Sequence, residues 1–332
     1  MIDFRYHIVS LIAVFLALAV GVVLGAGPLQ GSLGDQLQLQ IEQLREEKDA
    51  LRVDLDDARA ENEELSAFID ATSGELLQGT LAEVKVSVIE LPGTDERTVD
   101  ALLDRIEQAG GELVGQVDLT ARWTDPAEQA LRDQTASEVT AQLLIPPPDD
   151  ATTELVLGQA LALGLIERDA LATETFSSTA RAVYAPLLDA DLIDETETPT
   201  MPADVVLVVA PASLADPSEA TDADAAVLAI EVATVTGFAG RDAVLAGPDD
   251  GSTDLVNAVR ADPAASAAIT TVDSADTVTG QVIAPLALAA VQRGVAVNHY
   301  GLAADATTVL PQLPEPVDDG ANASDDATEG ES

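Results

Sequence analysis

The amino-acid sequence predicts an α/β protein that carries an N-terminal transmembrane helix and a coiled-coil stalk. Three observations lead to this prediction. Residues Ile8 to Ala26 are almost entirely apolar, residues 32–77 carry a seven-residue apolar repeat, and β-rich runs alternate with helical runs from Lys85 onward. Such alternation favours a mostly parallel sheet with helices on both faces, of the Rossmann-like or flavodoxin-like kind.

These patterns divide the chain into five segments. We expect a cytoplasmic stub at residues 1–7, a transmembrane anchor helix at 8–26 and a coiled-coil stalk at 32–77. An extracytoplasmic α/β domain is expected at 85–310. Residues 311–332 are rich in Pro, Asp and Gly and predict a disordered acidic tail.

The apolar run from Ile8 to Ala26 has 19 residues, none of them charged. As a helix it would span about 28 Å, close to the hydrocarbon thickness of a bilayer. A cleaved signal peptide is the alternative interpretation, but its apolar region usually has about 7–15 residues. The longer run, and a poor cleavage site at Leu24-Gly25-Ala26, favour an uncleaved anchor, which we expect to be broken at Gly27-Pro28 and Gly31.

Positive charge predicts the orientation of this anchor. Arg5 and His7 precede the run, whereas the next basic residue is Arg45, so the positive-inside rule places the N-terminus in the cytoplasm. Small residues recur at every fourth position of the run and would let two membrane helices approach closely. This candidate packing stripe consists of Ala13, Ala17, Gly21 and Gly25.

The segment after the anchor fits a heptad repeat in which eight of ten core positions are apolar. The two polar exceptions, Lys48 and Asn62, are residue types that specify register and dimeric state at an a position. The d positions are Leu37, Leu44, Leu51, Ala58 and Leu65, and the a positions are Ile41, Lys48, Leu55, Asn62 and Ile69.

Charges beside the repeat agree with a parallel pair of helices. The e positions hold Arg45, Arg52 and Arg59, whereas the g positions hold Glu47, Asp54 and Glu61. In a parallel dimer Glu47 would face Arg52 of the other helix, and Asp54 would face Arg59. The alternative is a single amphipathic helix packed on its own globular domain.

Six strands and at least six helices are expected in the α/β domain. The expected strands are Lys85–Leu91, Glu112–Leu119, Asp204–Pro211, Asp242–Gly247, Ile269–Ala275 and Val295–Gly301. The first helix would start at Thr94 or Asp95 and end at Gly110, and the second would start at Asp125-Pro126 and end near Pro146. A helical stretch is expected at Ala151–Leu192. Further helices are expected at Ala220–Thr236, from Ser252 or Thr253 to Arg260, and from Thr277 to Arg293.

Composition excludes several kinds of function. With 15 basic and 59 acidic residues the formal net charge is −44, which is unsuited to neutralising nucleic-acid phosphates. The sequence has no Cys, two His and two Met, so no conventional soft-ligand copper site and no multi-His metal centre is expected. Copper as a partner therefore has no support from ligands, and we expect no cofactor.

Motifs of catalysis are also missing from the sequence. It contains no G-x-S-x-G elbow, no P-loop, and no G-x-G-x-x-G after the first strand, where Leu91-Pro92-Gly93 stands instead. His299 beside Asp305 is a possible general base, although a structural hydrogen-bonding role is the more common one for a single His at a strand end. We therefore expect a protein that is not an enzyme.

Three segments resemble the actinobacterial MctB family, often labelled copper transporter. FRYHIVSLIAVFLALAVGVVLGAGPL at residues 4–29 resembles the start of that family. The segments TTVDSADTVTGQVIAPLALA and NHYGLAADATTVLP look like its C-terminal signature. The resemblance implies a cell-envelope protein of mycolic-acid-type or related bacteria, with a proposed role in copper export. It also implies a link to envelope assembly and division beside a membrane-anchored partner that restrains cell-wall hydrolases.

Together these observations predict a single-pass membrane protein that binds proteins in envelope or division machinery. The coiled coil would pair with a second copy or with another membrane-anchored envelope protein, and the anchor would contact the lipid bilayer. The alternative, implied by the family label, is copper export or copper homeostasis. A pore barrel would need many alternating segments of about 10 residues, whereas this chain alternates strand and helix.

Overall fold

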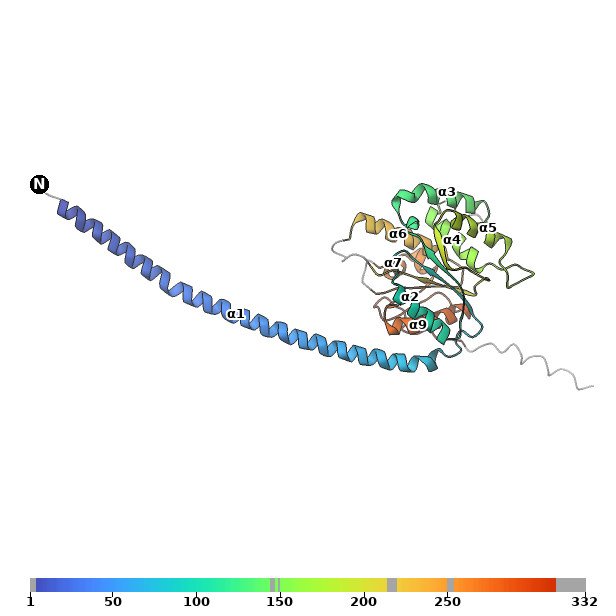
Figure 1. The fold of residues 1–332 in the computed structure, drawn as a ribbon, viewed down its shortest axis with the longest axis horizontal. Helices are drawn as coiled ribbons and strands as arrows, with labels where there is room; N and C mark the ends of the chain where they lie inside the picture. The colour runs from blue at the N-terminus through green and yellow to red at the C-terminus, as the bar shows by residue number, and fades with distance from the viewer. Residues whose placement is uncertain (1–3, 144–146, 149, 214–219, 250–253, 315–332) are drawn as a thin grey trace, which may run out of the picture. The chain divides into compact units, whose positions relative to one another are not determined.

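The computed structural model describes residues 4–143, 147, 148, 150–213, 220–249 and 254–314, and side chains are described outside residues 26–36 and Phe4. The chain forms two compact units, Met1–Ala67 and Phe68–Ser332. Helix α1 (Phe4–Leu77), blue in Figure 1, makes up the described part of the first unit and enters the second.

Helix α1 is continuous, so the break predicted at Gly27-Pro28 and Gly31 is wrong. Proline removes one backbone hydrogen bond from a helix and costs about 3 kcal/mol in its interior. That loss is local. The residues on both sides keep their own i→i−4 bonds, so a helix can pass through a proline with a kink instead of ending there.

The second unit contains a mixed α/β fold. Within the described residues, its strands are β1 (Lys85–Glu90), β2 (Glu112–Leu119), β3 (Ile193–Glu197), β4 (Val205–Val209), β5 (Ala243–Ala246), β6 (Thr270–Val272) and β7 (His299–Tyr300). The α-helices are α2 (Glu96–Gln108), α3 (Gln129–Thr140), α4 (Thr153–Ile166), α5 (Ser178–Asp189), α6 (Asp222–Thr236), α7 (Leu255–Ala261), α8 (Pro263–Ser266) and α9 (Val278–Gln292). Two short 3-10 helices, η1 (Ala121–Trp123) and η2 (Pro126–Glu128), lie between β2 and α3.

The described strands form one seven-stranded sheet in the order β3-β2-β1-β4-β5-β6-β7. All neighbouring pairs are parallel except β2 and β3, which are antiparallel. The chain runs from β1 to β2 in one direction and later resumes at β4 on the other side of β1. The order therefore reverses between β1 and β4, which is the topological switch point of the sheet.

Helices cover both faces of this sheet (Figure 1). On one face α3, α4, α5, α6 and α7 enclose a core that includes Trp123, Leu161 and Phe238. On the other face α2 and α9 pack with Leu77 at the end of α1 and with Leu81 in the turn that follows it. Strand β4 is fully buried because both of its faces meet helices, as its run VVLVV predicts. The mostly parallel α/β sheet expected from the sequence is confirmed.

Polar side chains start many of these helices where the sequence predicts. Asp95 accepts a hydrogen bond from the backbone N–H of Arg97 at α2, and Thr277 caps α9. Asp125 stands before Pro126 at the start of η2. Each such cap stabilises its helix by about 1 kcal/mol. The expected caps Ser252 and Thr253 lie outside the described residues, and Asp254 caps α7.

Several elements differ from the prediction. The helical stretch expected at Ala151–Leu192 is two helices, α4 and α5, separated by a turn with a bridge between Arg168 and Phe176. Strand β3 was missed because its sequence IDETE is polar. The last strand is only His299–Tyr300 instead of Val295–Gly301. The helix predicted to end near Pro146 ends at Thr140. Most of the predicted tail lies outside the described residues.

Candidate functional site

One helix of the described residues is long and apolar enough to cross a membrane. This segment, Arg5–Gly25 of α1, has 21 residues with a mean hydropathy of 2.9 and none of it is buried. The small-residue stripe Ala13, Ala17, Gly21 and Gly25 is open along this segment, and no atom lies within 4 Å of a Cβ built at Gly21 or Gly25. A second helix could therefore approach this face without a steric clash.

The heptad positions that follow lie on α1 and are largely solvent-exposed. Leucine and isoleucine side chains of this kind normally lie inside a protein. Their exposed fractions are 53% for Leu37, 51% for Ile41, 67% for Leu44, 68% for Leu51, 48% for Leu55 and 55% for Leu65. Lys48, Ala58 and Asn62 are exposed as well. We call the positions Leu37 to Leu65 the heptad seam.

The charged residues beside the heptad seam are also exposed, and two of the arginines make weak ion pairs within α1. Arg52 lies 3.9 Å from Asp49, and Arg59 lies 3.9 Å from Asp56, with both arginines 67% exposed. Exposed ion pairs of this kind contribute about 0–1 kcal/mol. The arginines could therefore exchange these partners for acidic residues of a second helix at little cost.

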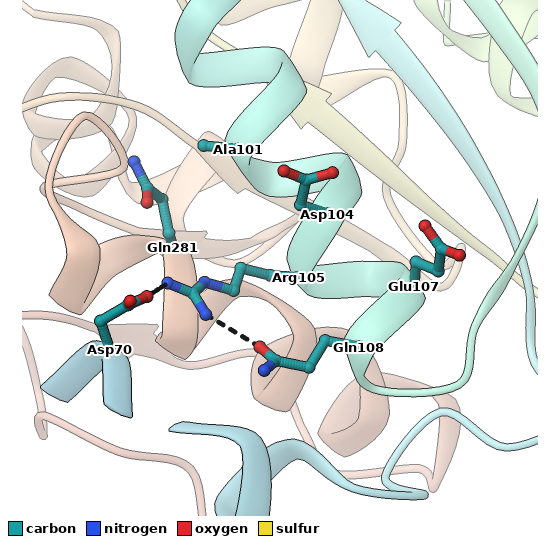
Figure 2. Close-up of a pocket in the computed structure, with 7 residues that line it drawn as sticks. All are labelled: Asp70, Ala101, Asp104, Arg105, Glu107, Gln108 and Gln281. Atoms are coloured by element: carbon teal, nitrogen blue, oxygen red, sulfur yellow. Dashed lines mark hydrogen bonds and ion pairs between the residues drawn. The ribbon is translucent and has the colours of Figure 1, made fainter. Parts of the chain in front are cut away.

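The last turns of α1 belong to the sheet domain. Ile69, the final predicted a position, is half-buried and packs against the core that contains Leu77 and Leu81. Arg105 of α2 holds these turns: it pairs with Asp70 and donates to Gln108 Oε1 at 2.9 Å (Figure 2). It also donates to Ser73 Oγ at 3.0 Å. The exposed part of the seam therefore ends before Ile69.

Figure 2 shows the hollow around this arginine, which has a volume of about 560 Å³. Its lining is polar and combines α2 side chains with Asp70 of α1 and Gln281 of α9. The Arg105 guanidinium is occupied by Asp70, Ser73 and Gln108. These contacts join α1 and α2, so this arrangement is structural.

His299 lies in a polar cluster at the β6–β7 end of the sheet. Its Nδ1 is 2.9 Å from Thr271 Oγ1, and its Nε2 is 2.8 Å from Ser266 Oγ. Arg260 Nε donates to the same Thr271 oxygen at 2.9 Å. Among the described residues, each ring nitrogen of His299 therefore has one hydroxyl group within hydrogen-bond distance.

Arg260 organises the rest of this cluster. Its Nη1 lies 2.9 Å from Asp273 and 2.8 Å from Asp305, and its Nη2 donates to the Tyr300 carbonyl at 2.8 Å. Burial and the Arg260 charge lower the pKa of His299, whereas Asp305 raises it by a smaller amount. Because the two ring nitrogens lie close to the Thr271 and Ser266 hydroxyl groups, both have a hydrogen-bond partner, which supports the structural role considered for His299.

The described residues contain no group of three or more His, Cys, Asp or Glu side chains placed to hold a metal ion. The acidic residues are numerous, yet many of them cap helices or pair with arginines. Asp254 and Asp262, for example, accept hydrogen bonds from backbone N–H groups at the starts of α7 and α8.

Comparison with known proteins identifies the relatives of this chain. Residues 1–311 match the family described as "Copper transport outer membrane protein, MctB". The chain belongs to the MctB family. It is 30% identical over 328 residues to the copper transporter MctB of Mycobacterium tuberculosis (strain ATCC 25618 / H37Rv), covering 93% of this chain and 99% of that protein. Its identity to the copper transporter MctB of Mycobacterium leprae (strain TN) is 30% over 326 residues, covering 94% of this chain and 100% of that protein.

This MctB-family match confirms the resemblance expected from the N-terminal and C-terminal segments. It runs through the long helix and the sheet domain together. One group that sequence reasoning missed is Glu231 of α6, which is only 6% exposed. The sequence does contain a sign of this burial. Glu231 interrupts the apolar run AVLAIEVATV, three residues after Leu228 and four before Val235, and this spacing places it on the same helix face as both.

Proposed function

We propose that this protein is a single-pass, membrane-anchored envelope protein that binds other proteins and catalyses no reaction. The observation that carries the proposal is helix α1, in which an apolar segment of membrane-spanning length is followed by the exposed heptad seam. The first part would hold the protein in a bilayer with its N-terminus in the cytoplasm. The second part would pair with another helix.

The exposed seam supports helix pairing on energetic grounds. Six Leu and Ile side chains of the seam are about half or more exposed in the single chain. Complete burial of one such side chain stabilises an assembly by about 1.5–3 kcal/mol. In a parallel pair the a and d residues of one helix fit between those of the other, and the flanking e and g charges of the two helices attract each other. We propose a second copy of this chain as the partner.

Cysteine crosslinking tests this pairing directly, because the natural sequence has no Cys. Leu51→Cys places a thiol at a d position, which faces its own copy in a parallel in-register dimer. Val53→Cys is the matched control, since it is similarly exposed, 59% against 68%, but lies on the opposite side of the helix. A disulfide needs Cβ atoms within about 4.5 Å of each other.

We expect mild oxidation of membranes that contain the full chain to give a disulfide-linked dimer with Leu51→Cys and little with Val53→Cys. Equal yields from both variants would indicate random collision and contradict the paired seam. A mixed disulfide between Leu51→Cys and a different protein would show instead that the coil is shared with another envelope protein.

The name of the relatives, copper transporter MctB, favours copper transport as a second candidate function. Under that proposal the exposed carboxylates of this chain would bind copper(II), since the sequence offers no Cys and only two Met. Calorimetric titration of the full chain with copper(II) and copper(I) tests it. A site with a stoichiometry of one and selectivity over zinc would support copper handling, whereas weak binding at many sites would contradict it.

A further inference from the structure

A cavity lies at the topological switch point of the sheet, where doubly wound folds usually bind their ligands. The loops that follow β1 and β4 both border it, through Pro92 and Gly93 and through Pro211 to Ser213. These loops are held together, because Leu91 N–H donates to the Val209 carbonyl at 3.0 Å and the Thr94 hydroxyl lies 3.2 Å from the same oxygen.

The walls of this switch-point cavity are mostly apolar. Its volume is about 430 Å³, within the range of small-molecule sites. Helix α6 supplies one wall through Val227 and Leu228, and Leu255 at the start of α7 closes another side. The apolar walls would exclude water from a bound hydrocarbon group.

Three carboxyl groups are among the described residues that line this space, those of Asp224, Glu231 and Asp254. Glu231 lies on the buried side of α6, on the same face as Leu228 and Val235, and its side chain is 6% exposed. Within the described residues no hydrogen bond or ion pair reaches its carboxyl group. Burial raises the pKa of Glu231 to about 7. A buried carboxyl group without a partner is costly, so a position that would suit leucine holds Glu at the expense of stability.

The other charges around the cavity are negative and are already used by the fold. Asp224 forms a capping box with Thr221 at the start of α6, and Asp254 accepts a hydrogen bond from Asn257 N–H at 2.7 Å. No Lys, Arg or His is found among the described residues that line the cavity. The site therefore lacks a cation, and the net charge of −44 favours the approach of one.

We propose that the switch-point cavity binds a small apolar molecule with one amino group, whose ammonium pairs with Glu231 and whose hydrocarbon part packs between α6 and α7. A carboxylate and an ammonium form a charge-assisted hydrogen bond of about twice the strength of a neutral one. Glu231 is the one of the three lining carboxyl groups for which the described residues supply no partner, which fits one amino group, and the walls of proline, valine and leucine fit its carbon skeleton.

Three probes of one shape test this ligand class: 2-phenylethylamine, 2-phenylethanol and 3-phenylpropionate. Binding to the full chain in lipid nanodiscs is measured by calorimetry at pH 7.5. We expect the amine to bind at least tenfold more tightly than the alcohol, and the carboxylate to bind most weakly. Equal binding of the three, or no binding of the amine, would overturn the proposal.

Glu231→Gln keeps the side-chain shape and removes the charge. It should weaken amine binding at least tenfold and change alcohol binding less than twofold. Glu138→Gln, an exposed substitution on α3, is the matched control and should change neither. Unchanged amine binding in Glu231→Gln would overturn the assignment of the ammonium to this carboxyl.

A measurement on the natural sequence keeps the proposal testable if Glu231→Gln folds poorly. Because the Glu231 carboxyl is partly protonated near pH 7, amine binding should release protons, and the binding heat should depend on the ionisation enthalpy of the buffer. The alcohol should show no such dependence. Amine binding without proton release would contradict pairing with Glu231.

Discussion

Arg260→Met should destabilise the sheet domain more than the loss of any exposed arginine. The guanidinium of Arg260 makes four polar contacts of 2.8–2.9 Å, to Thr271, Asp273, Asp305 and the Tyr300 carbonyl. Its side chain is 3% exposed and that of Asp273 is 1% exposed. Removing the arginine therefore leaves a buried carboxylate without its cation.

The size of this effect follows from the burial. Breaking a buried ion pair on one side costs about 3–5 kcal/mol. Asp273 keeps hydrogen bonds from Leu302 N–H and from the Ser274 hydroxyl, which places the expected loss near the lower value. In a domain of about 150–250 residues each kcal/mol changes the Tm by roughly 2–4 °C, so a fall of roughly 6–12 °C is expected.

Circular dichroism melting of the full chain measures this loss, with Arg97→Met as the control. Arg97 is 90% exposed and pairs only with Asp95, at 3.3 Å, so its removal should cost less than about 1 kcal/mol. In the double variant with Asp273→Asn the loss should be smaller than the sum of the two single losses. Equal Tm values for Arg260→Met and Arg97→Met would refute the reasoning.

Two further predictions concern packing and pH. Gly158→Ala should destabilise the domain by about 1–3 kcal/mol in chemical denaturation, because a Cβ at Gly158 of α4 would lie 2.1 Å from the Thr234 carbonyl oxygen of α6. Gly74→Ala is the control and should be neutral, since its Cβ would meet only the end of the Gln108 side chain, at 3.3 Å. The pKa of Glu231 rises from 4.5 to about 7 on folding, so its contribution to stability is present at low pH and is lost as the pH rises through 7. Between pH 5 and pH 8 the natural sequence should lose roughly 2–3 kcal/mol relative to Glu231→Gln, and parallel pH–stability curves would contradict this sign.

The order of strands and helices could be predicted where the local sequence determines the structure. The apolar run at β4 predicts a strand buried on both faces because no other position in a domain suits five consecutive aliphatic residues. Asp95 and Thr277 mark helix starts because a side-chain oxygen there satisfies a free backbone N–H group.

Elements that depend on distant contacts could not be predicted in this way. Strand β3 is polar, and it forms because β2 offers an unpaired edge to Ile193–Glu197. The turn between α4 and α5 depends on the bridge between Arg168 and Phe176. Pro28 lies within α1 although its local chemistry predicts a break.

The same distinction applies to the candidate sites. The heptad seam can be read from spacing alone, because its residues share one face of a single helix. The Arg260 cluster cannot be predicted from spacing, since it joins Asp273 and Asp305, which lie in separate parts of the fold. The burial of Glu231 also depends on the loops after β1 and β4, which lie far from it in the sequence.

The acidic strand β3 has a consequence for copies of this protein that meet at high concentration. It forms one edge of the sheet, and Asp194, Glu195 and Glu197 follow one another along it. An edge strand with free backbone groups can recruit the same strand of a neighbour and start aggregation. Here two such strands would bring six carboxylates together, so like-charge repulsion protects neighbouring domains from fusing into a continuous sheet.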